Sequence, residues 1–365
     1  MKKSHLRVAA LCGSLVLAAG VTGCGARGGD TAPAASSAAS GAAAAGKIAF
    51  LMPDLASTRY EQQDNPLFTA KIKQLCADCE VTYQNADSDP AKQQQQADSA
   101  LAQGVKVLVL DAVDTKAAAS IVTNAKSQQV PVVTYDRPIT QTSADYYVSF
   151  DNQGIGKLIS DSLVEQLKAD KADGGVLIVN GSPTDDAAQL IKKGIHEGVD
   201  TSGFEVLAEY DTPQWEPQKA QDWVSGQITQ YRSEIVGVVA ANDGTGGGAI
   251  AAFKAAGTKP VPPVTGNDAE IAAIQRIISG DQYNTISKPI KIVAEAAAEA
   301  AYGFLSGNPP QGDTTLFDTP SQLFTPTVVT QENVKEVIFD GGIYTADQVC
   351  TGQYASGCDK LGIGS

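Results

Sequence analysis

The arrangement of apolar and polar positions predicts strands that alternate with helices along most of the chain. In the first half we expect strands at residues 47–52, 80–83, 105–110 and 130–135, separated by helices at 67–75, 90–103 and 115–128. In the second half we expect strands at 175–179, 204–208, 235–240 and 261–265, and helices at 187–198, 217–231, 250–256 and 271–278. Strands that alternate with amphipathic helices of ~10 to 15 residues are typical of parallel sheets covered on both faces. The chain is therefore expected to form two similar α/β units, each with its own sheet.

Nearly every predicted strand runs into a polar cluster. Capping of the following helices explains any single one of these clusters. Together they place Asp, Asn, Arg and Lys side chains, and one Trp, beyond the carboxyl ends of the strands, where open α/β sheets bind their ligands. Such a set suits a small, neutral, polyhydroxylated ligand, because each hydroxyl can donate to a carboxylate or amide and accept from a cation, while an aromatic ring covers the apolar face. The clusters include 53–54, 111, 136–137, 180–186, 210–215, 242–243, 267–268 and 287–288.

The N-terminus has the features of an export signal. Basic residues at positions 2, 3 and 7 precede an apolar run at 6–20 that is short for a membrane span. The run ends in Val-Thr-Gly-Cys at 21–24, which resembles the lipobox of bacterial lipoproteins. This resemblance implies a signal peptide at 1–23 and a lipid on Cys24; secretion with cleavage nearby and an unmodified Cys24 is the alternative. Residues 24–46 are mostly Ala, Gly and Ser, so we expect a flexible tether there.

Charge and rare residues exclude several classes of protein. The 365 residues include 41 acidic and 27 basic side chains, and the net charge of -14 argues against nucleic-acid binding. Only two His residues are present, which disfavours most zinc hydrolase sites. The glycines at 244–248 lack both the Gly-Lys-Ser/Thr ending and the G-x-G-x-x-G spacing of phosphate loops, so we expect a tight turn between a strand and a helix. We expect neither a cofactor nor a metal site.

Four of the six Cys residues remain after Cys12 is removed with the signal and Cys24 is assigned to the lipobox. They allow three pairings, of which Cys76 with Cys79 and Cys350 with Cys358 close the shortest loops. A redox or metal pair at 76 and 79 is the alternative. Disulfides fit an exported protein.

Several motifs occur in the order found in one known family. They are LASTRYEQQDNPLF from Leu55, VTYDRPI from Val133, YYVSFDNQGIGK from Tyr146, NGSPTDDAAQL from Asn180, QWEPQKA from Gln214, AANDGTGGGAI from Ala240, VTGNDAE from Val264, ISKPI from Ile286, GDTTL from Gly312 and LFTPTVVTQENVKEVIFDGG from Leu323. From about residue 47 to 342 the chain thus resembles the periplasmic sugar-binding proteins of ABC importers, and within them the D-xylose-binding proteins.

The resemblance implies the type I fold of periplasmic binding proteins: two Rossmann-like lobes with parallel sheets, joined by a multi-strand hinge. Lobe 1 is expected at 47–150 plus about 288–320, lobe 2 at 151–287 plus about 321–345, and a C-terminal tail with the Cys pair at 346–365. The crossings between the lobes are expected near 149–152, 285–288 and 320.

Matched motif by motif, the resemblance also implies a set of ligand contacts. They are Arg59, Tyr60, Asp136, Arg137, Asp185, Trp215, Asn242, Asp268 and Lys288. Two positions depart from the family. Tyr60 stands where Trp is usual, and Asp186-Ala187 where Asn-Asn is usual, which removes an amide that would bond the sugar. D-xylose is therefore the leading ligand, and another pyranose such as glucose stays open.

The resemblance implies a monomeric receptor that delivers a monosaccharide to membrane permease subunits from the outer face of the cytoplasmic membrane, without catalytic residues. An exported glycoside hydrolase is the competing class, because sequence alone does not exclude two Asp residues that flank a glycosidic bond. A sugar-responsive repressor is disfavoured by the export signal, the acidic charge and the lack of an N-terminal helix-turn-helix.

Overall fold

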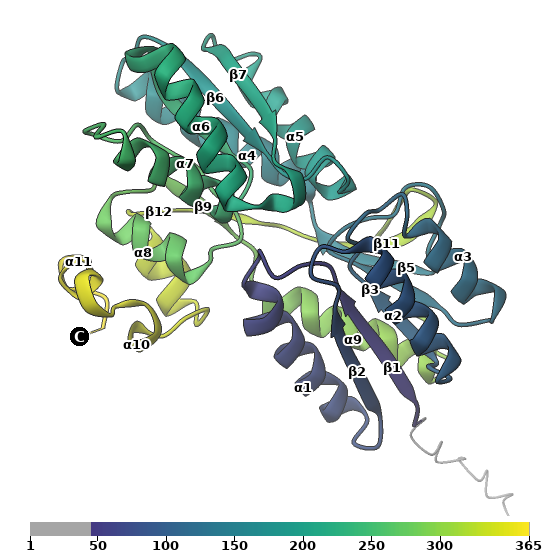
Figure 1. Ribbon diagram of the computed structural model, residues 1–365. Coiled ribbons are helices and arrows are strands. Elements are labelled where there is room, and N and C mark those ends of the chain that lie inside the picture. Colours follow the sequence, from purple (N-terminus) through teal and green to yellow (C-terminus); the bar gives the residue numbers. More distant parts are fainter. Residues whose placement is uncertain (1–44, 365) are drawn as a thin grey trace, which may run out of the picture. The chain divides into compact units, whose positions relative to one another are not determined.

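The computed structural model describes residues 45–364, so the expected signal peptide, Cys24 and nearly all of the expected tether lie outside the described residues. A seven-stranded sheet, in the order β10-β11-β5-β4-β3-β1-β2, forms the centre of the first lobe (Figure 1). All of its neighbouring strands run parallel except β10 and β11. The strands are β1 (Lys47–Met52), β2 (Glu80–Asn85), β3 (Val107–Leu110), β4 (Val132–Tyr135), β5 (Tyr146–Phe150), β10 (Thr314–Leu316) and β11 (Thr319–Phe324).

Helices cover both faces of this sheet, as the side-chain alternation of β1 requires. Ile48, Phe50 and Met52 face the α1 and α9 side, whereas Ala49 and Leu51 face α2 and α3. Every residue of β1 after Lys47 is buried. The helices of this lobe are the π-helix η1 (Tyr60–Asp64), α1 (Asn65–Leu75), α2 (Pro90–Ala102), α3 (Ala119–Ser127) and α9 (Ile290–Leu305).

The second lobe is built on a three-stranded parallel sheet in the order β7-β6-β8. An extended segment at Val264 adds a parallel bridge to Val238 of β8. Helices α4 and α5 cover one face of the sheet, and α6 and α7 cover the other. The elements are α4 (Asn152–Ala169), β6 (Gly175–Asn180), α5 (Asp186–Val199), β7 (Glu205–Asp211), α6 (Pro217–Tyr231), β8 (Ile235–Ala240), α7 (Asp243–Ala255) and α8 (Ile271–Ser279), with short 3-10 turns η2 (Pro213–Trp215) and η3 (Arg232–Glu234).

Glycines allow α4 and α5 to approach closely. A Cβ at Gly156 of α4 would lie 1.9 Å from the Ile191 carbonyl oxygen, and one at Gly194 of α5 would lie 2.0 Å from that of Gln153. No side chain fits at these distances, so the two helices pack backbone to backbone.

The chain passes between the lobes three times. It leaves β5 at Phe150 and enters α4, and it leaves β9 (Asn284–Ser287) for α9; both places lie where crossings were expected. The third place differs, because β11 stays paired with β5 as far as Phe324 and β12 (Thr327–Thr330) then pairs with β9. Residues 321–324, expected in lobe 2, therefore belong to the first sheet. Pro320 does not end the strand but lies near its start, where a missing N–H is tolerated.

The glycine-rich stretch after β8 was expected as a turn, and that expectation is wrong. Helix α7 already begins at Asp243, because Asn242 and Thr245 form a reciprocal capping box. The glycines serve close packing: a Cβ at Gly248 would lie 2.3 Å from the Pro217 carbonyl oxygen of α6, and one at Gly246 would lie 2.5 Å from that of Thr265.

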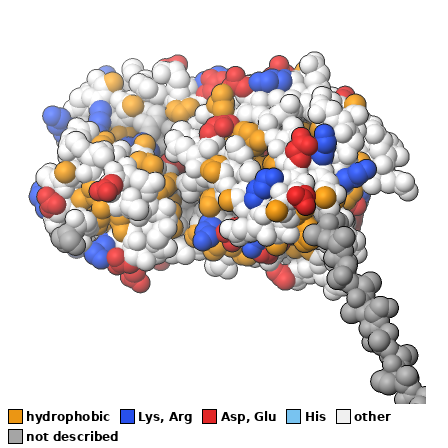
Figure 2. Space-filling model, turned by 90° about the horizontal axis from the view of Figure 1, so that it is seen from below, with side chains coloured by type: hydrophobic (Ala, Val, Ile, Leu, Met, Phe, Trp, Pro, Cys, Tyr) orange, Lys and Arg blue, Asp and Glu red, His pale blue; other side chains and the backbone are white. Residues whose placement is uncertain are grey.

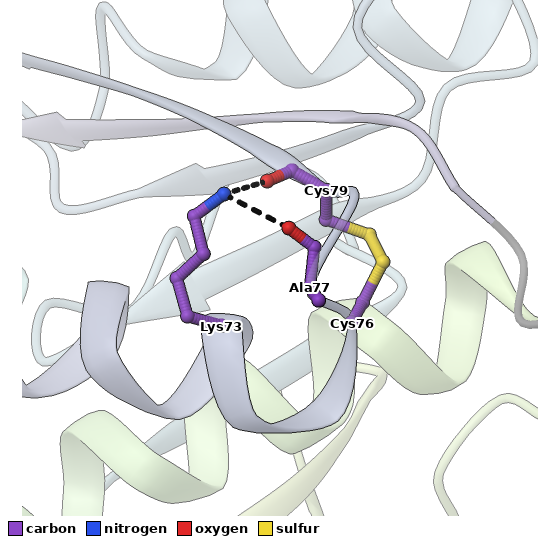
Figure 3. The surroundings of a disulfide bond; sticks show 4 residues. All are labelled: Lys73, Cys76, Ala77 and Cys79. Carbon is purple, nitrogen blue, oxygen red and sulfur yellow. Dashed lines mark hydrogen bonds between the residues drawn. A yellow bond between two sulfur atoms is a disulfide. The ribbon is translucent and has the colours of Figure 1, made fainter.

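Two local disulfides are present. Cys76 and Cys79 are joined at the end of α1, where Lys73 donates to the Cys79 carbonyl at 2.7 Å and to that of Ala77 at 3.3 Å (Figure 3). Cys350 and Cys358 are joined in the C-terminal segment, which packs against α8. That segment contains η4 (Lys335–Asp340), α10 (Ala346–Val349), η5 (Gly352–Tyr354) and α11 (Ala355–Lys360).

On the face shown in Figure 2, charged side chains of both signs are dispersed among uncharged ones, and no broad basic patch forms there. Within residues 45–364, the structure has no helix that is both long and apolar enough to cross a bilayer.

Candidate functional site

The nine side chains expected from the motifs line one cavity. Each lies just beyond the carboxyl end of β1, β4, β6, β7, β8 or β9, or beyond the extended segment at Val264. The cavity has a volume of about 30 Å³. The lining residues are Ser57, Arg59, Tyr60, Asp136, Arg137, Asn152, Asp185, Ala187, Ile191, Trp215, Asn242, Asn267, Asp268 and Lys288.

Arg59, which precedes η1, is held by the buried carboxylate of Asp64 at the end of that helix. Its guanidinium donates from Nε and from a terminal nitrogen to the two oxygens of Asp64, at 3.1 and 2.8 Å. The Tyr135 hydroxyl of β4 also donates to Asp64 and holds the carboxylate in place. The other terminal nitrogen of Arg59 lies 3.5 Å from Asp136 and 3.6 Å from Asp268. One face of the cavity thus carries a cation whose direction is set by bidentate pairing.

Arg137 joins the two lobes directly. Its terminal nitrogens donate to Asp54 at 2.7 Å and to the Ala112 carbonyl at 2.9 Å, both in lobe 1. Its Nε lies 3.1 Å from Asp185 of lobe 2 and 3.5 Å from Asp111. This arginine therefore bridges carboxylates on opposite sides of the cavity.

Asp136 lies among three cations. Burial alone would raise the pKa of this carboxyl, but Arg59, Lys288 and Arg137 outweigh burial and lower the pKa to about 2. Lys288 is shared between Asp268 at 2.8 Å and Asp136 at 3.8 Å. Asp136 is therefore ionised at neutral pH and can accept hydrogen bonds from a neutral ligand.

Trp215 supplies the flat apolar surface. A Cβ at Gly181 would lie 2.1 Å from the indole ring, so the absence of a side chain at Gly181 lets the ring lie against the backbone. The indole N–H donates to Asp185 at 2.9 Å, while the other oxygen of Asp185 accepts from the Ala187 amide and caps α5. Trp215 is 6% exposed, and the Gly181 backbone and the hydrogen bond to Asp185 together hold its ring in place.

Tyr60 and Asn242 complete the set. The Tyr60 hydroxyl accepts from Arg137 at 3.3 Å, and its ring centre lies 5.1 Å from the Arg59 guanidinium carbon. The Asn242 side-chain oxygen accepts from the backbone and the hydroxyl of Thr245. Its amide nitrogen makes no hydrogen bond within the described part of the chain, so it can donate to a ligand.

The comparisons with known proteins agree with this architecture. Residues 48–309 match the periplasmic binding protein domain. The chain belongs to the periplasmic binding protein family. A D-xylose-binding periplasmic protein of Escherichia coli is 33% identical over 83% of this binding protein and 92% of the relative. The multiple sugar-binding periplasmic receptor ChvE of Rhizobium radiobacter is 30% identical over 84% and 93%.

A solved structure shares the fold of this binding protein. It is an ABC transporter solute-binding protein from Clostridium phytofermentans with bound β-D-glucose. The TM-score is 0.76 at 27% identity, and the match covers 83% of this chain and 99% of the other. The proteins that this binding protein resembles are transport receptors rather than enzymes.

Five lining residues of the binding protein were not among the expected contacts. Ser57, Asn152 and Ile191 lie near predicted residues, and Ala187 is the position that departs from the family motif. Asn267 is the fifth. It directly precedes Asp268 after an extended segment. This place in the sequence is the signal from which a cavity-lining role for Asn267 can be predicted.

Hydrogen bonds also join the lobes of the binding protein around the cavity. Residues 184–186 of lobe 2 make two of these contacts: Thr115 donates to the Thr184 carbonyl at 3.0 Å, and the Thr140 hydroxyl donates to Asp186 at 2.6 Å. On the other side, the Thr58 hydroxyl and backbone N–H donate to Glu270 at 3.1 Å. The structure is therefore a conformation in which the two lobes touch.

Proposed function

We propose that this protein is the solute-binding lipoprotein of an ABC sugar importer and that it binds a monosaccharide in the cavity between the lobes. D-xylose is the first candidate for this ligand. One observation carries the proposal: the cavity combines a fixed tryptophan face with carboxylates and cations that neutralise one another. A neutral sugar offers an apolar ring face and hydroxyls that both donate and accept, so it matches each of these groups. The sugar-binding relatives support the same class of ligand.

The cavity is tight, and this supports a pentose. D-xylose lacks the hydroxymethyl group that D-glucose carries on the ring, so it needs less room. Tyr60 and Ala187 differ from the usual family residues at two lining positions, and the multiple-sugar relative and the glucose-bound structure keep glucose as the second candidate.

Calorimetric titration of the mature protein with D-xylose, D-glucose, D-ribose and D-galactose tests the proposal. We expect the largest affinity for D-xylose. Tighter binding of a hexose would replace xylose as the ligand, and absence of heat with all four sugars would remove the sugar-binding function.

Delivery of the sugar requires contact with a permease, and the closed form is the state we expect the permease to recognise. Because Arg137 and the contacts around the cavity join the lobes, a sugar that binds both lobes shifts the protein toward this form. No chemical step is performed on the sugar. We expect the receptor to act as a monomer on the outer face of the cytoplasmic membrane.

The anchor at Cys24 is part of the proposal. If this residue carries a lipid, fractionation of expressing cells finds the full chain with membranes and a Cys24→Ser variant in the soluble fraction. Equal distribution of the two proteins would argue for simple secretion.

A further inference from the structure

Asn267 contributes a buried, unpaired side-chain oxygen to the lining of the cavity. It lines the cavity and is 2% exposed, yet its side-chain oxygen is buried without a hydrogen-bond partner in the described range. By contrast, Asp185, Asp268 and Arg59 are each held by at least one ion pair. A buried amide without a partner is rare in folded proteins and indicates a partner supplied by water or ligand.

The backbone around Asn267 is held firmly. Its carbonyl accepts from the Asp243 amide at the start of α7 at 2.9 Å, and the amide of Asp268 donates to Ile286 of β9 at 3.0 Å. The Gly266 amide donates to the side chain of Asn284 at 3.3 Å. Because both sides of the residue are tied to regular elements, the side chain cannot find a partner by a shift of the loop. It is preorganised for a group that enters the cavity.

Ala187 lines the same cavity. Its methyl side chain can make no hydrogen bond with a ligand. Asn267 presents an unpaired amide to the same space.

On the basis of the proposed sugar-binding function, we propose that Asn267 hydrogen-bonds a sugar hydroxyl directly and is a specificity-determining residue of this site. Its oxygen accepts from the hydroxyl, and its nitrogen can donate to a second ring substituent. A sugar analogue that lacks this hydroxyl leaves the amide unpaired in the closed cavity and binds more weakly.

The test compares the wild-type protein with Asn267→Ala by titration with D-xylose, with D-glucose as the second probe. We expect the variant to lose about 5- to 100-fold in affinity, as when one buried hydrogen-bonding group loses its partner. We also expect the melting temperature of the sugar-free variant to equal or exceed that of wild type, because the variant removes an unpaired buried amide. If the role of Asn267 were purely structural, its replacement by alanine would instead lower the melting temperature.

A series of monodeoxy analogues of the sugar that binds identifies the contacted hydroxyl. One analogue should bind the wild-type protein more weakly than the parent sugar does. On Asn267→Ala, this analogue and the parent sugar should bind with equal affinity. Asn180→Ala is the control, because Asn180 is a buried asparagine outside the cavity lining that donates to Glu209 and Asp211. This control should keep wild-type affinity.

Unchanged sugar affinity of Asn267→Ala would overturn the inference and assign the amide to a water molecule. If wild type itself binds neither probe, the proposed function fails and the inference fails with it. Binding by wild type with no effect of the substitution overturns the inference alone.

Discussion

Replacing Trp215 with alanine is expected to abolish most of the sugar affinity. The indole is fixed by Gly181 behind it and by its hydrogen bond to Asp185, so the ring is ordered before the sugar arrives. Loss of a preorganised tryptophan at the centre of a binding site costs about 2–4 kcal/mol, which corresponds to roughly 30- to 1,000-fold in affinity. Calorimetry with D-xylose and D-glucose measures this change.

The second tryptophan of the chain provides the control. Trp223 lies in α6 and stacks on Tyr210 with ring centres 5.3 Å apart, outside the cavity lining. Trp223→Ala should lower the melting temperature and leave sugar affinity near wild type. If Trp215→Ala binds sugar as tightly as wild type, the sugar does not stack on this ring, and the transfer of its role from the family is wrong.

The strand ends could be predicted from the sequence because the signal there is local. A buried apolar run that stops at Asp136-Arg137 or Asn242 marks the edge of a parallel sheet, and the nine expected side chains do line one cavity. The apolar spacing of Ile155, Ile159 and Leu163, preceded by Asp151 as N-cap, is an equally local signal for α4, a helix absent from the predicted elements. Helix α9 is harder to recognise, because its many alanines are buried on several sides and leave no narrow apolar stripe.

The partners of the site residues could not be predicted, because they depend on the topology. Arg137 pairs with Asp54, which is 83 positions away, and with Asp185 in the other lobe. No local pattern relates these three residues. The same holds for Asn267, whose importance lies in the absence of a partner among the described residues.

Arg137→Met is expected to remove sugar binding and to destabilise the protein by about 3–5 kcal/mol, because removing one member of a buried ion-pair network leaves the others unpaired. Asp54, Asp111 and Asp185 then lack their shared cation. Burial already raises the pKa of Asp111 and of Asp185. Without Arg137 the pKa values of these carboxyls rise further.

This change in pKa gives the variant a signature in its pH dependence. A carboxyl whose pKa is higher in the folded state than in the unfolded state binds its proton more tightly when folded, so stability falls as pH rises between the two values. Relative to wild type, Arg137→Met should therefore recover stability as the pH is lowered from 7 to 5. Thermal denaturation at both pH values measures this effect.

Two further variants separate charge from geometry in the role of Arg137. Arg137→Lys keeps the cation but cannot reach Asp54, the Ala112 carbonyl and Asp185 together, so it should restore much of the stability and little of the sugar affinity. Arg276→Met removes a partly buried arginine that bonds Gln282 and the Asp243 carbonyl outside the cavity lining, and it should keep wild-type affinity. Full affinity in Arg137→Lys would show that positive charge alone suffices, and that the fork which joins the two lobes is not required for binding.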